Sequence, residues 1–397
     1  MKKTFQPTKW TLLFLMLSAM LILMGGAAVA PALPLISTAF PDASETMVSL
    51  IITLPSLAVA LTGFFLGALS DRIGRMPVLI VSLLLFTIAG SSGYYLDSLE
   101  AILVGRFIVG IGIGGLTTTV TSLITEYYTG ITRTKILGYQ AGAMGFGVLV
   151  LETSGGFLAG VSWRISFLIY AVGAVILIGV LLTMREPEKE SASLPKVSGK
   201  PQEKVSINKA DLAILYITLF LGVALFFLMP TKLPYLLSDM LGSNTAFVGG
   251  LILGFMGLCA SIASINVWRI VRRFNRQVVL GLAFFCLAVG MLLLSAASSL
   301  TMVILSVILV GFGNGLLMPS ITMWLAEIVP TAVMGKAAGG YSVSLNLGNF
   351  FSSLLAVPLL IAVGTYAGLF AAGGAVALLI GLVIFGNILL QRRNVSA

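Results

Sequence analysis

Apolar runs of about 20 residues, separated by short polar breaks, dominate this chain, and about 20 residues of helix span the hydrocarbon core of a bilayer. Of its 397 residues, 58% are hydrophobic and only 9% are charged, whereas about a quarter of an ordinary soluble domain is charged. This composition excludes a soluble enzyme, a secreted domain and a disordered scaffold. The sequence therefore predicts an all-α membrane protein that crosses the bilayer many times.

Twelve transmembrane helices are expected, six on each side of one hydrophilic stretch. Their runs lie near residues 10–37, 46–69, 76–95, 99–126, 136–160, 164–184, 210–236, 245–268, 277–296, 299–327, 336–360 and 364–390. The stretch 185–209 is rich in Lys, Glu, Ser and Pro, which is typical of a flexible linker. It predicts an N-terminal six-helix bundle over 1–184 and a C-terminal six-helix bundle over 210–397.

The basic residues indicate how the chain is oriented. All but three of the 23 lysines and arginines fall on one side of the predicted topology, the exceptions being Arg106, Arg164 and Lys232. Because Lys and Arg concentrate in cytoplasmic loops, both termini are expected in the cytoplasm and the protein in the plasma (inner) membrane. The net charge of +9 then reflects topology, and no nucleic-acid partner is expected.

An internal repeat relates the two halves. A shift of 201 residues superposes separate segments: Gly110, Gly112 and Gly114 on Gly311, Gly313 and Gly315, and Arg72, Arg75 and Glu126 on Arg273, Arg276 and Glu327. Two parallel repeats of six helices are the plan of a transporter whose bundles rock about a central site. The repeat therefore predicts a carrier and disfavours a channel or an enzyme.

A short motif follows the second run, where Gly67, Asp71, Arg72, Gly74 and Arg75 form the pattern G-x-x-x-D-R-x-G-R. This pattern resembles the signature between the second and third helices of the major facilitator superfamily, and the resemblance extends over essentially the whole chain. It implies two pseudo-symmetric six-helix bundles. It also implies a gating motif that stabilises the outward-open state by tying the halves together at the cytoplasmic side, with Asp71 and Arg75 matching that role.

The fourth run contains a charged residue at depth. Arg106 lies about two turns in from the non-cytoplasmic end, in the glycine-rich segment 103–115. An arginine at such a depth usually has a buried partner and a function. It is similar to the R-x-x-x-G element of the proton-coupled members of that superfamily. The alternative is an arginine that extends to the membrane interface.

The fifth run carries a glycine pattern with one departure. The spacing G-x8-G-x3-G-P-x2-G-G, which marks the 12-span drug/proton antiporters of the superfamily, is kept by Gly138, Gly147, Gly155 and Gly156. Where that pattern has its Gly-Pro pair, this chain has Leu151 and Glu152. The groove for close helix packing is kept, but a carboxylate replaces the proline kink.

Glu152 and Arg106 are expected at equal depth on adjacent helices, which predicts an ion pair that couples transport to protons. A lone carboxylate near the bilayer centre costs about 2.5–3.5 kcal/mol, so Glu152 should be paired, protonated or in contact with water. Three interpretations stay open for it: a proton carrier or ligand for a cationic substrate, a purely structural ion pair, and a residue at the lipid interface.

Two carboxylates, Glu126 and Glu327, end the fourth and tenth runs at equivalent positions of the repeat. A carboxylate at a helix C-terminus opposes the helix dipole, so each is expected to bind a basic group. Arg75, Arg133 and the arginines of the eighth-to-ninth loop are the candidates. We interpret this pair as cytoplasmic gate carboxylates.

The cavity between the bundles is expected to be lined by adaptable apolar side chains and a few amides. The candidates are Met20, Met24, Tyr139, Met144, Phe226, Phe227, Met229, Asn314, Trp324, Tyr341, Asn346 and Asn349. For each of them, plain helix packing is an equally open interpretation. No metal site or cofactor is expected, because the two cysteines have no spaced partner, histidine is absent and no P-loop occurs.

The resemblance to drug/proton antiporters implies proton-coupled efflux of small hydrophobic or cationic compounds by alternating access. The expected partners are a small-molecule substrate, protons and membrane lipid, and the protein is expected to be a monomer and not an enzyme. One alternative is a transporter of the same fold that exports or imports a specific metabolite. An alternative of another class is a non-transporting receptor or lipid-handling membrane protein.

Overall fold

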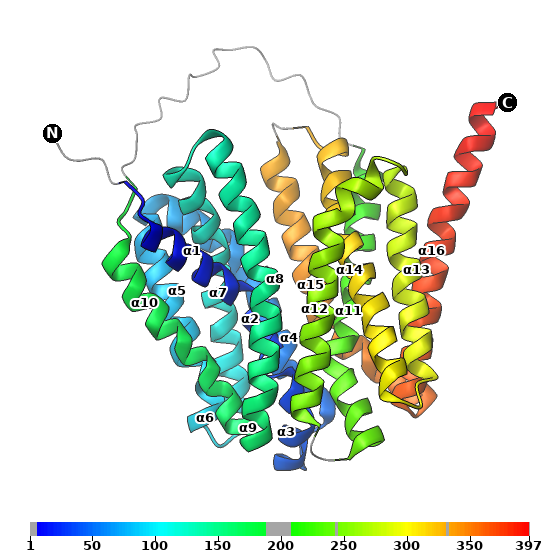
Figure 1. Cartoon of the computed structure of the whole chain (residues 1–397), viewed down its shortest axis with the longest axis horizontal. Coiled ribbons are helices and arrows are strands. Elements are labelled where there is room, and N and C mark those ends of the chain that lie inside the picture. Colours follow the sequence, from blue (N-terminus) through cyan, green and yellow to red (C-terminus); the bar gives the residue numbers. More distant parts are fainter. Residues whose placement is uncertain (1–5, 188–207, 243–244, 331–332, 397) are drawn as a thin grey trace.

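The computed structural model describes residues 6–187, 208–242, 245–330 and 333–396, and every regular element in these ranges is a helix. The helices stand side by side in one layered bundle (Figure 1). The start of α1 and the end of α16 lie at the same end of this bundle, which we call the terminal side. Most of the predicted linker 185–209 lies outside the described residues.

The helices up to residue 187 make up what we call the first half. They are α1 (Lys9–Ile22), α2 (Met24–Ala27), η1 (Ala30–Ala32), α3 (Leu33–Ala39), α4 (Glu45–Ile73), α5 (Arg75–Gly90), α6 (Ser92–Tyr95), α7 (Leu99–Tyr127), α8 (Gly130–Val161), α9 (Trp163–Ser166), η2 (Phe167–Ala171) and α10 (Val172–Thr183). The second half, from residue 208 on, holds α11 (Lys209–Leu241), α12 (Ala246–Val271), α13 (Arg276–Ser295), α14 (Leu300–Ile328), α15 (Met334–Val363) and α16 (Tyr366–Ser396).

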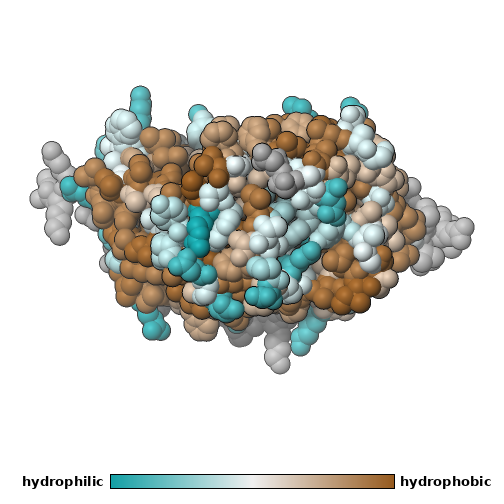
Figure 2. All heavy atoms as spheres, turned by 90° about the horizontal axis from the view of Figure 1, so that it is seen from below, coloured by the Kyte–Doolittle hydropathy of each residue, from teal (hydrophilic) through white to brown (hydrophobic). Residues whose placement is uncertain are grey.

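Eleven helical segments in the described residues are long and apolar enough to cross a membrane, and the bent pair at the start of the chain would be a twelfth. This confirms the prediction of an all-α membrane protein. Large apolar side chains on the outside, such as Phe64, Phe65 and Leu182, are well exposed, as expected for helices that face lipid. Figure 2 shows the end opposite the terminal side, where hydrophilic residues cross the middle of the molecule and apolar residues surround them.

The first span is broken, which the sequence analysis missed. Its two parts, Lys9–Ile22 and Met24–Ala39, meet at an angle of 61°. Pro31 and Pro34 lie at the beginnings of η1 and α3, where a residue without an N–H group starts a helix but cannot continue one. The break leaves backbone carbonyl groups in the interior of the first half that are free to accept hydrogen bonds.

The repeat is visible in the helix boundaries. Three helices of the first half, α4, α5 and α7, begin 201 residues before α12, α13 and α14. Their packing corresponds as well: α4 and α5 both pack on α7, and α12 and α13 both pack on α14. The 201-residue offset read from short motifs therefore holds for whole helices.

Two long helix crossings join the halves, besides shorter contacts of η1 and α3 with α11 and of η1 with α12. α8 packs along α12, and α4 packs along α15. Under the 201-residue offset these crossings are equivalent, because α4 corresponds to α12 and α8 to α15. The halves therefore meet through two seams of related geometry, which we call the α8/α12 seam and the α4/α15 seam.

Candidate transport site

Glu152 lies in the α8/α12 seam. Glu152 is 4% exposed. Its backbone carbonyl oxygen faces Gly250 of α12, and a Cβ atom added to Gly250 would lie 2.5 Å from that oxygen. Side-chain atom Oε2 is buried and has no hydrogen-bond partner among the described residues. No ion pair to Glu152 occurs there either. Glu152 is thus a buried carboxylate without a counter-charge, among the described residues, where α8 of the first half packs on α12 of the second.

Glycines allow the two helices to approach this closely. Gly156 of α8 lies against Gly250 and against the carbonyl group of Ala246, and Gly155 lies against the carbonyl group of Ala28 in the broken first span. The predicted glycine groove of α8 is therefore used on both of its sides. Gly138 is different, because a Cβ there would meet nothing within 4 Å.

Arg106 does not pair with Glu152, and the predicted ion pair is wrong for this structure. The guanidinium group is fully buried and donates to the carbonyl oxygens of Gly25 and of Ile51, the latter at 2.8 Å, and to the Tyr170 hydroxyl at 2.9 Å. Gly25 belongs to the broken first span, Ile51 to α4 and Tyr170 to η2, while the third guanidinium nitrogen, Nη1, is buried without a hydrogen-bond partner among the described residues. Arg106 therefore ties α7 to α2, α4 and η2.

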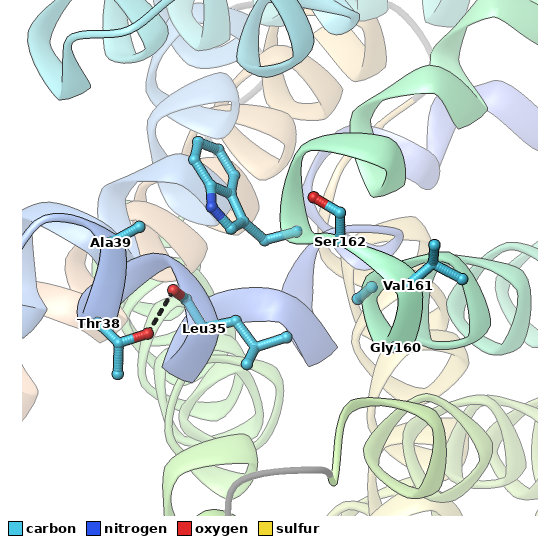
Figure 3. Close-up of a pocket in the computed structure, with 8 residues that line it drawn as sticks. Leu35, Thr38, Ala39, Gly160, Val161 and Ser162 are labelled. Atoms are coloured by element: carbon cyan, nitrogen blue, oxygen red, sulfur yellow. Dashed lines mark hydrogen bonds between the residues drawn. The ribbon is translucent and has the colours of Figure 1, made fainter.

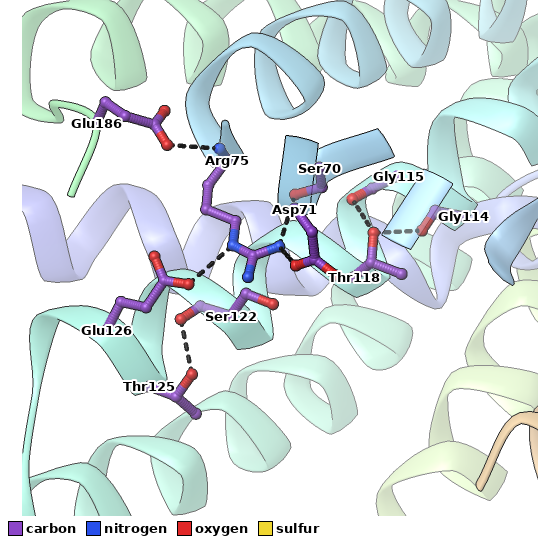
Figure 4. Close-up of polar contacts among 10 residues, drawn as sticks. All are labelled: Ser70, Asp71, Arg75, Gly114, Gly115, Thr118, Ser122, Thr125, Glu126 and Glu186. Atoms are coloured by element: carbon purple, nitrogen blue, oxygen red, sulfur yellow. Dashed lines mark hydrogen bonds and ion pairs between the residues drawn. The ribbon is translucent and has the colours of Figure 1, made fainter. Parts of the chain in front are cut away.

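The motif after α4 forms a compact polar cluster at the terminal side (Figure 4). The Arg75 guanidinium lies between two carboxylates, with Nη1 2.5 Å from Asp71 and Nε 2.8 Å from Glu126. Glu126 thus has one of its predicted basic partners. All three residues belong to the first half, so the contacts of Arg75 tie α4, α5 and α7 together and do not reach the second half.

Glu186 completes this cluster, and the sequence analysis missed it. Its two carboxylate oxygens accept hydrogen bonds from the backbone N–H groups of Arg75 and Met76, both at 2.7 Å. A carboxylate at the first turn of a helix satisfies free N–H groups and the helix dipole. Gly74 makes this approach possible, because its φ of +108° favours glycine and a Cβ there would lie 2.8 Å from Glu186.

The second copy of the motif repeats the central contact. Arg276 at the start of α13 lies 3.1 Å from Glu327 at the end of α14, and these positions are the repeat counterparts of Arg75 and Glu126. Glu327 thus has its predicted partner among the arginines of the eighth-to-ninth loop. The Arg276 guanidinium also lies 5.1 Å from the centre of the Trp324 ring.

A polar cluster at the opposite side joins the halves, and no motif in the sequence predicts it. Lys232 of α11 is 2% exposed, and its Nζ lies 3.3 Å from the Ser49 hydroxyl and 3.8 Å from the Glu45 carboxylate. Tyr366 donates to Glu45 at 2.5 Å. We call Glu45, Ser49, Lys232 and Tyr366, with the hydrogen-bonded pair Ser37 and Tyr235, the cross-half cluster.

The α4/α15 seam is also hydrogen-bonded. Asn349 donates to the Ser56 hydroxyl at 2.6 Å, and the hydroxyl groups of Thr53 and Ser353 lie 2.9 Å apart. Asn349, a predicted cavity residue, is therefore a contact between the halves. Together with the cross-half cluster, these bonds join the halves in the seam and at the side opposite the termini.

The other predicted cavity residues differ in their burial and contacts. Met24 and Met229 are fully buried, Tyr139 is 48% exposed beneath Lys135, and Tyr341 contacts Thr322 and Met318. Partly buried positions are held by Met20, Met144, Phe226, Phe227, Asn314, Trp324 and Asn346. Asn314 stands out because its side-chain oxygen is buried without a partner among the described residues.

A hollow of about 360 Å³ lies beside α3, α8 and α9 (Figure 3). Its lining includes Leu35, Thr38, Gly160 and Ser162, all from the first half, and Thr38 donates to the Leu35 carbonyl oxygen at 2.8 Å. None of the predicted cavity residues lines it. Described Cys, Asp and Glu side chains form no cluster that could hold a metal ion.

The sequence profile of the Major Facilitator Superfamily matches residues 15–353 of this chain and, in a second match, residues 245–395. The chain belongs to the Major Facilitator Superfamily. Its members are secondary transporters and not enzymes, so this facilitator is a multi-pass membrane protein that carries a small molecule.

The curated relatives of this chain are named for different substrates. "Multidrug resistance protein 1" of Bacillus subtilis is 25% identical over 356 residues, which cover 87% of this chain and 88% of the relative. The "Hexuronate transporter" of the same species is 24% identical over 399 residues, covering 94% and 93%. A solved structure, that of a D-xylose-proton symporter, matches with a TM-score of 0.74 at 19% identity and covers 94% of this chain and 96% of that one. This likeness shows the fold.

Proposed function

We propose that this facilitator exports small hydrophobic or cationic compounds in exchange for protons. The observation that carries the proposal is Glu152, a carboxylate buried in the α8/α12 seam without a hydrogen-bond or ion-pair partner in the described part of the chain. Such a group is unfavourable when charged unless it binds a proton or a cation. Glu152 therefore takes both roles in turn, with the proton and the cationic substrate as alternative occupants.

Alternating access follows from the contacts between the halves. In this conformation the cross-half cluster closes the side opposite the termini. The ion pairs at the terminal side, Arg75 with Glu126 and Arg276 with Glu327, stay within their own halves and leave the halves free to separate there. We assign the terminal side to the cytoplasm, which makes this the inward-facing state.

The motif of Asp71 and Arg75 then acts in the other state. When the halves rock and the cytoplasmic ends approach, this cluster becomes a contact surface for the second half, as the resemblance to the superfamily motif implies. Glu186, which binds the first turn of α5, lies in the same cluster at the start of the segment that leads to the second half. The two gates are thus built from different residues at opposite ends.

Coupling to protons supplies the energy for export. One charge that moves through 100 mV provides about 2.3 kcal/mol, and each factor of ten in a gradient costs about 1.4 kcal/mol. Exchange of one proton for one monovalent cation moves no net charge. For such substrates the pH gradient alone drives export, whereas neutral compounds also gain from the membrane potential.

Purified protein in proteoliposomes tests this proposal. Tetraphenylphosphonium serves as the lipophilic cation, and an imposed pH gradient is the only driving force. We expect flux against the cation gradient that stops when a protonophore is added. Flux that does not depend on the pH gradient would show that transport is not coupled to protons. Absence of any flux would favour a non-transporting receptor or lipid-handling protein.

A second candidate is transport of one specific metabolite. It is favoured by the hexuronate relative, which covers as much of the chain as the multidrug relative and has nearly the same identity. Saturable uptake or export of a single compound, unaffected by an excess of unrelated lipophilic cations, would support this candidate over drug efflux.

A further inference from the structure

Lys232 is a buried ammonium group that the proposed proton exchange does not use. It lies in the interior of the long helix α11 and is 2% exposed. A charged side chain at such depth is costly and as a rule serves a substrate or ion pathway. Its surroundings therefore show what kind of solute it serves.

The ammonium group is poorly compensated in this conformation. It can donate three hydrogen bonds, but its polar contacts are the Ser49 hydroxyl at 3.3 Å and the Glu45 carboxylate at 3.8 Å. Tyr366 binds the same carboxylate more closely, at 2.5 Å. A buried ion pair stabilises a protein only when its geometry is close and its remaining hydrogen-bonding groups are satisfied, so Glu45 is a weak counter-ion here.

Both polar partners of Lys232 lie on the opposite half. Glu45 and Ser49 belong to α4, whereas Lys232 belongs to α11. Opening on the side opposite the termini moves these elements apart, and the ammonium group then faces the opened space without its counter-ion. A carboxylate of a bound solute, in the position that Glu45 has left, would restore the charge balance beside Lys232.

We propose that Lys232 binds the carboxylate of an organic anion in the state open opposite the termini, and that Glu45 occupies this anion position when the side is closed. The proposal uses alternating access from the proposed function and adds organic carboxylates to the classes of solute that the protein recognises. A zwitterionic compound would then satisfy Lys232 and Glu152 at the same time.

The aromatic neighbours indicate the body of this anion. Tyr235 lies beneath the ammonium group at 5.3 Å and stacks on Tyr366, with ring centres 5.7 Å apart and planes 17° apart. Tyr366 donates a hydrogen bond to Glu45 of the first half. Opening of the side opposite the termini therefore breaks this bond and exposes the Tyr366 ring beside Lys232. A flat aromatic or apolar body next to the carboxylate suits such a surface.

Binding of radiolabelled benzoate, octanoate and glucuronate to the purified full-length protein in nanodiscs tests the proposal. We expect at least one of the three to bind, and Lys232→Gln to weaken that binding at least tenfold, while Lys232→Arg retains most of it. Glu45→Gln should strengthen binding severalfold, because it removes the internal competitor. A purely structural role of the pair would not produce opposite effects of these two substitutions.

Arg164→Gln is the matched control. Arg164 is a second cation of the same end of the molecule, already paired with Asp97 at 2.8 Å, so its removal should leave carboxylate binding unchanged. Should Lys232→Gln fail to fold, Glu45→Gln decides alone. Failure of all three probes to bind, equal losses in the Lys232 and Arg164 variants, or unchanged or weaker binding in Glu45→Gln would overturn the proposal.

The export assay in proteoliposomes and the binding assay in nanodiscs together separate this inference from the proposed function. Loss of pH-driven tetraphenylphosphonium export, with Lys232-dependent benzoate binding intact, would contradict proton-coupled cation efflux and leave the anion site standing. Intact cation export without Lys232-dependent carboxylate binding would contradict the anion site and leave proton-coupled cation efflux standing.

Discussion

Glu152 and Ser353 occupy equivalent positions of the two repeats, 201 residues apart, and only Ser353 has a hydrogen-bond partner in the described residues. Ser353 binds Thr53, whose repeat counterpart is Gly254, a glycine that packs against Leu149 and Thr153 of α8. Next to them, Asn349 binds Ser56, whereas the corresponding pair is Val148 against Gly257. The repeat has therefore kept one seam closed by polar pairs and made the other a glycine-packed seam with a lone carboxylate.

Replacement of Glu152 by glutamine should separate proton coupling from transport. We expect Glu152→Gln to abolish export driven by a pH gradient while passive exchange of substrate continues, because the amide fills the same space but binds no proton. Proteoliposomes with and without an imposed pH gradient measure both activities. Ser353→Ala is the matched control, and it should keep the coupling. Unchanged gradient-driven export in Glu152→Gln would remove Glu152 from the mechanism.

Arg106 should behave as a structural tie. Arg106→Lys leaves a single ammonium group that cannot reach Gly25, Ile51 and Tyr170 together, and each buried group left unpaired costs about 1–3 kcal/mol. We expect a lower thermal unfolding midpoint, measured by intrinsic fluorescence, with a smaller decrease for Tyr170→Phe. Full thermal stability combined with lost proton coupling in Arg106→Lys would instead return Arg106 to the coupling mechanism.

Gly74 should be far less replaceable than Gly130. Both have positive φ, but a Cβ at Gly74 meets the Glu186 carboxylate, and a Cβ at Gly130 meets nothing within 4 Å. Backbone strain of this kind costs about 1–3 kcal/mol, and Gly74→Ala also displaces the carboxylate that binds the first turn of α5. We expect Gly74→Ala to lower the unfolding midpoint more than Gly130→Ala does. Equal losses would show that the Glu186 contact adds nothing.

The hydrogen bond between Ser56 and Asn349 should contribute measurably to the α4/α15 seam. A double-mutant cycle with Ser56→Ala and Asn349→Ala is expected to give a coupling energy of about 0.6 kcal/mol, and at most about 1.7 kcal/mol, the range found for such bonds within membranes. Reversible unfolding in mixed micelles provides the energies. Additive effects of the two substitutions would mean that the bond is not formed in the populated state.

The main features of the fold could be predicted from the sequence because they depend on local chemistry and on duplication. The length of the apolar runs requires spanning helices, and the 201-residue offset made Glu126 and Glu327 equivalent, with Arg75, Arg133 and the arginines of the eighth-to-ninth loop as candidate partners. The break at Pro31 and Pro34 was missed, although both prolines are visible. The apolar run continues past both prolines, and the hydropathy of a run gives its length but not whether the helix bends.

The site was only partly predictable, because pairing depends on which helix faces which. Depth along the chain suggested Arg106 as the partner of Glu152, but Arg106 instead binds the carbonyl groups of Gly25 in the broken first span and of Ile51 in α4, and Glu152 packs against Gly250. The contacts of Lys232 with Glu45, and of Glu186 with the first turn of α5, join residues more than 100 positions apart. The amino-acid sequence by itself determined the spans, the duplication and the charged residues at depth. Only the packing of the helices decided which of those charges are compensated, because a buried charge is stabilised by the groups that tertiary structure places around it and not by its neighbours in the chain.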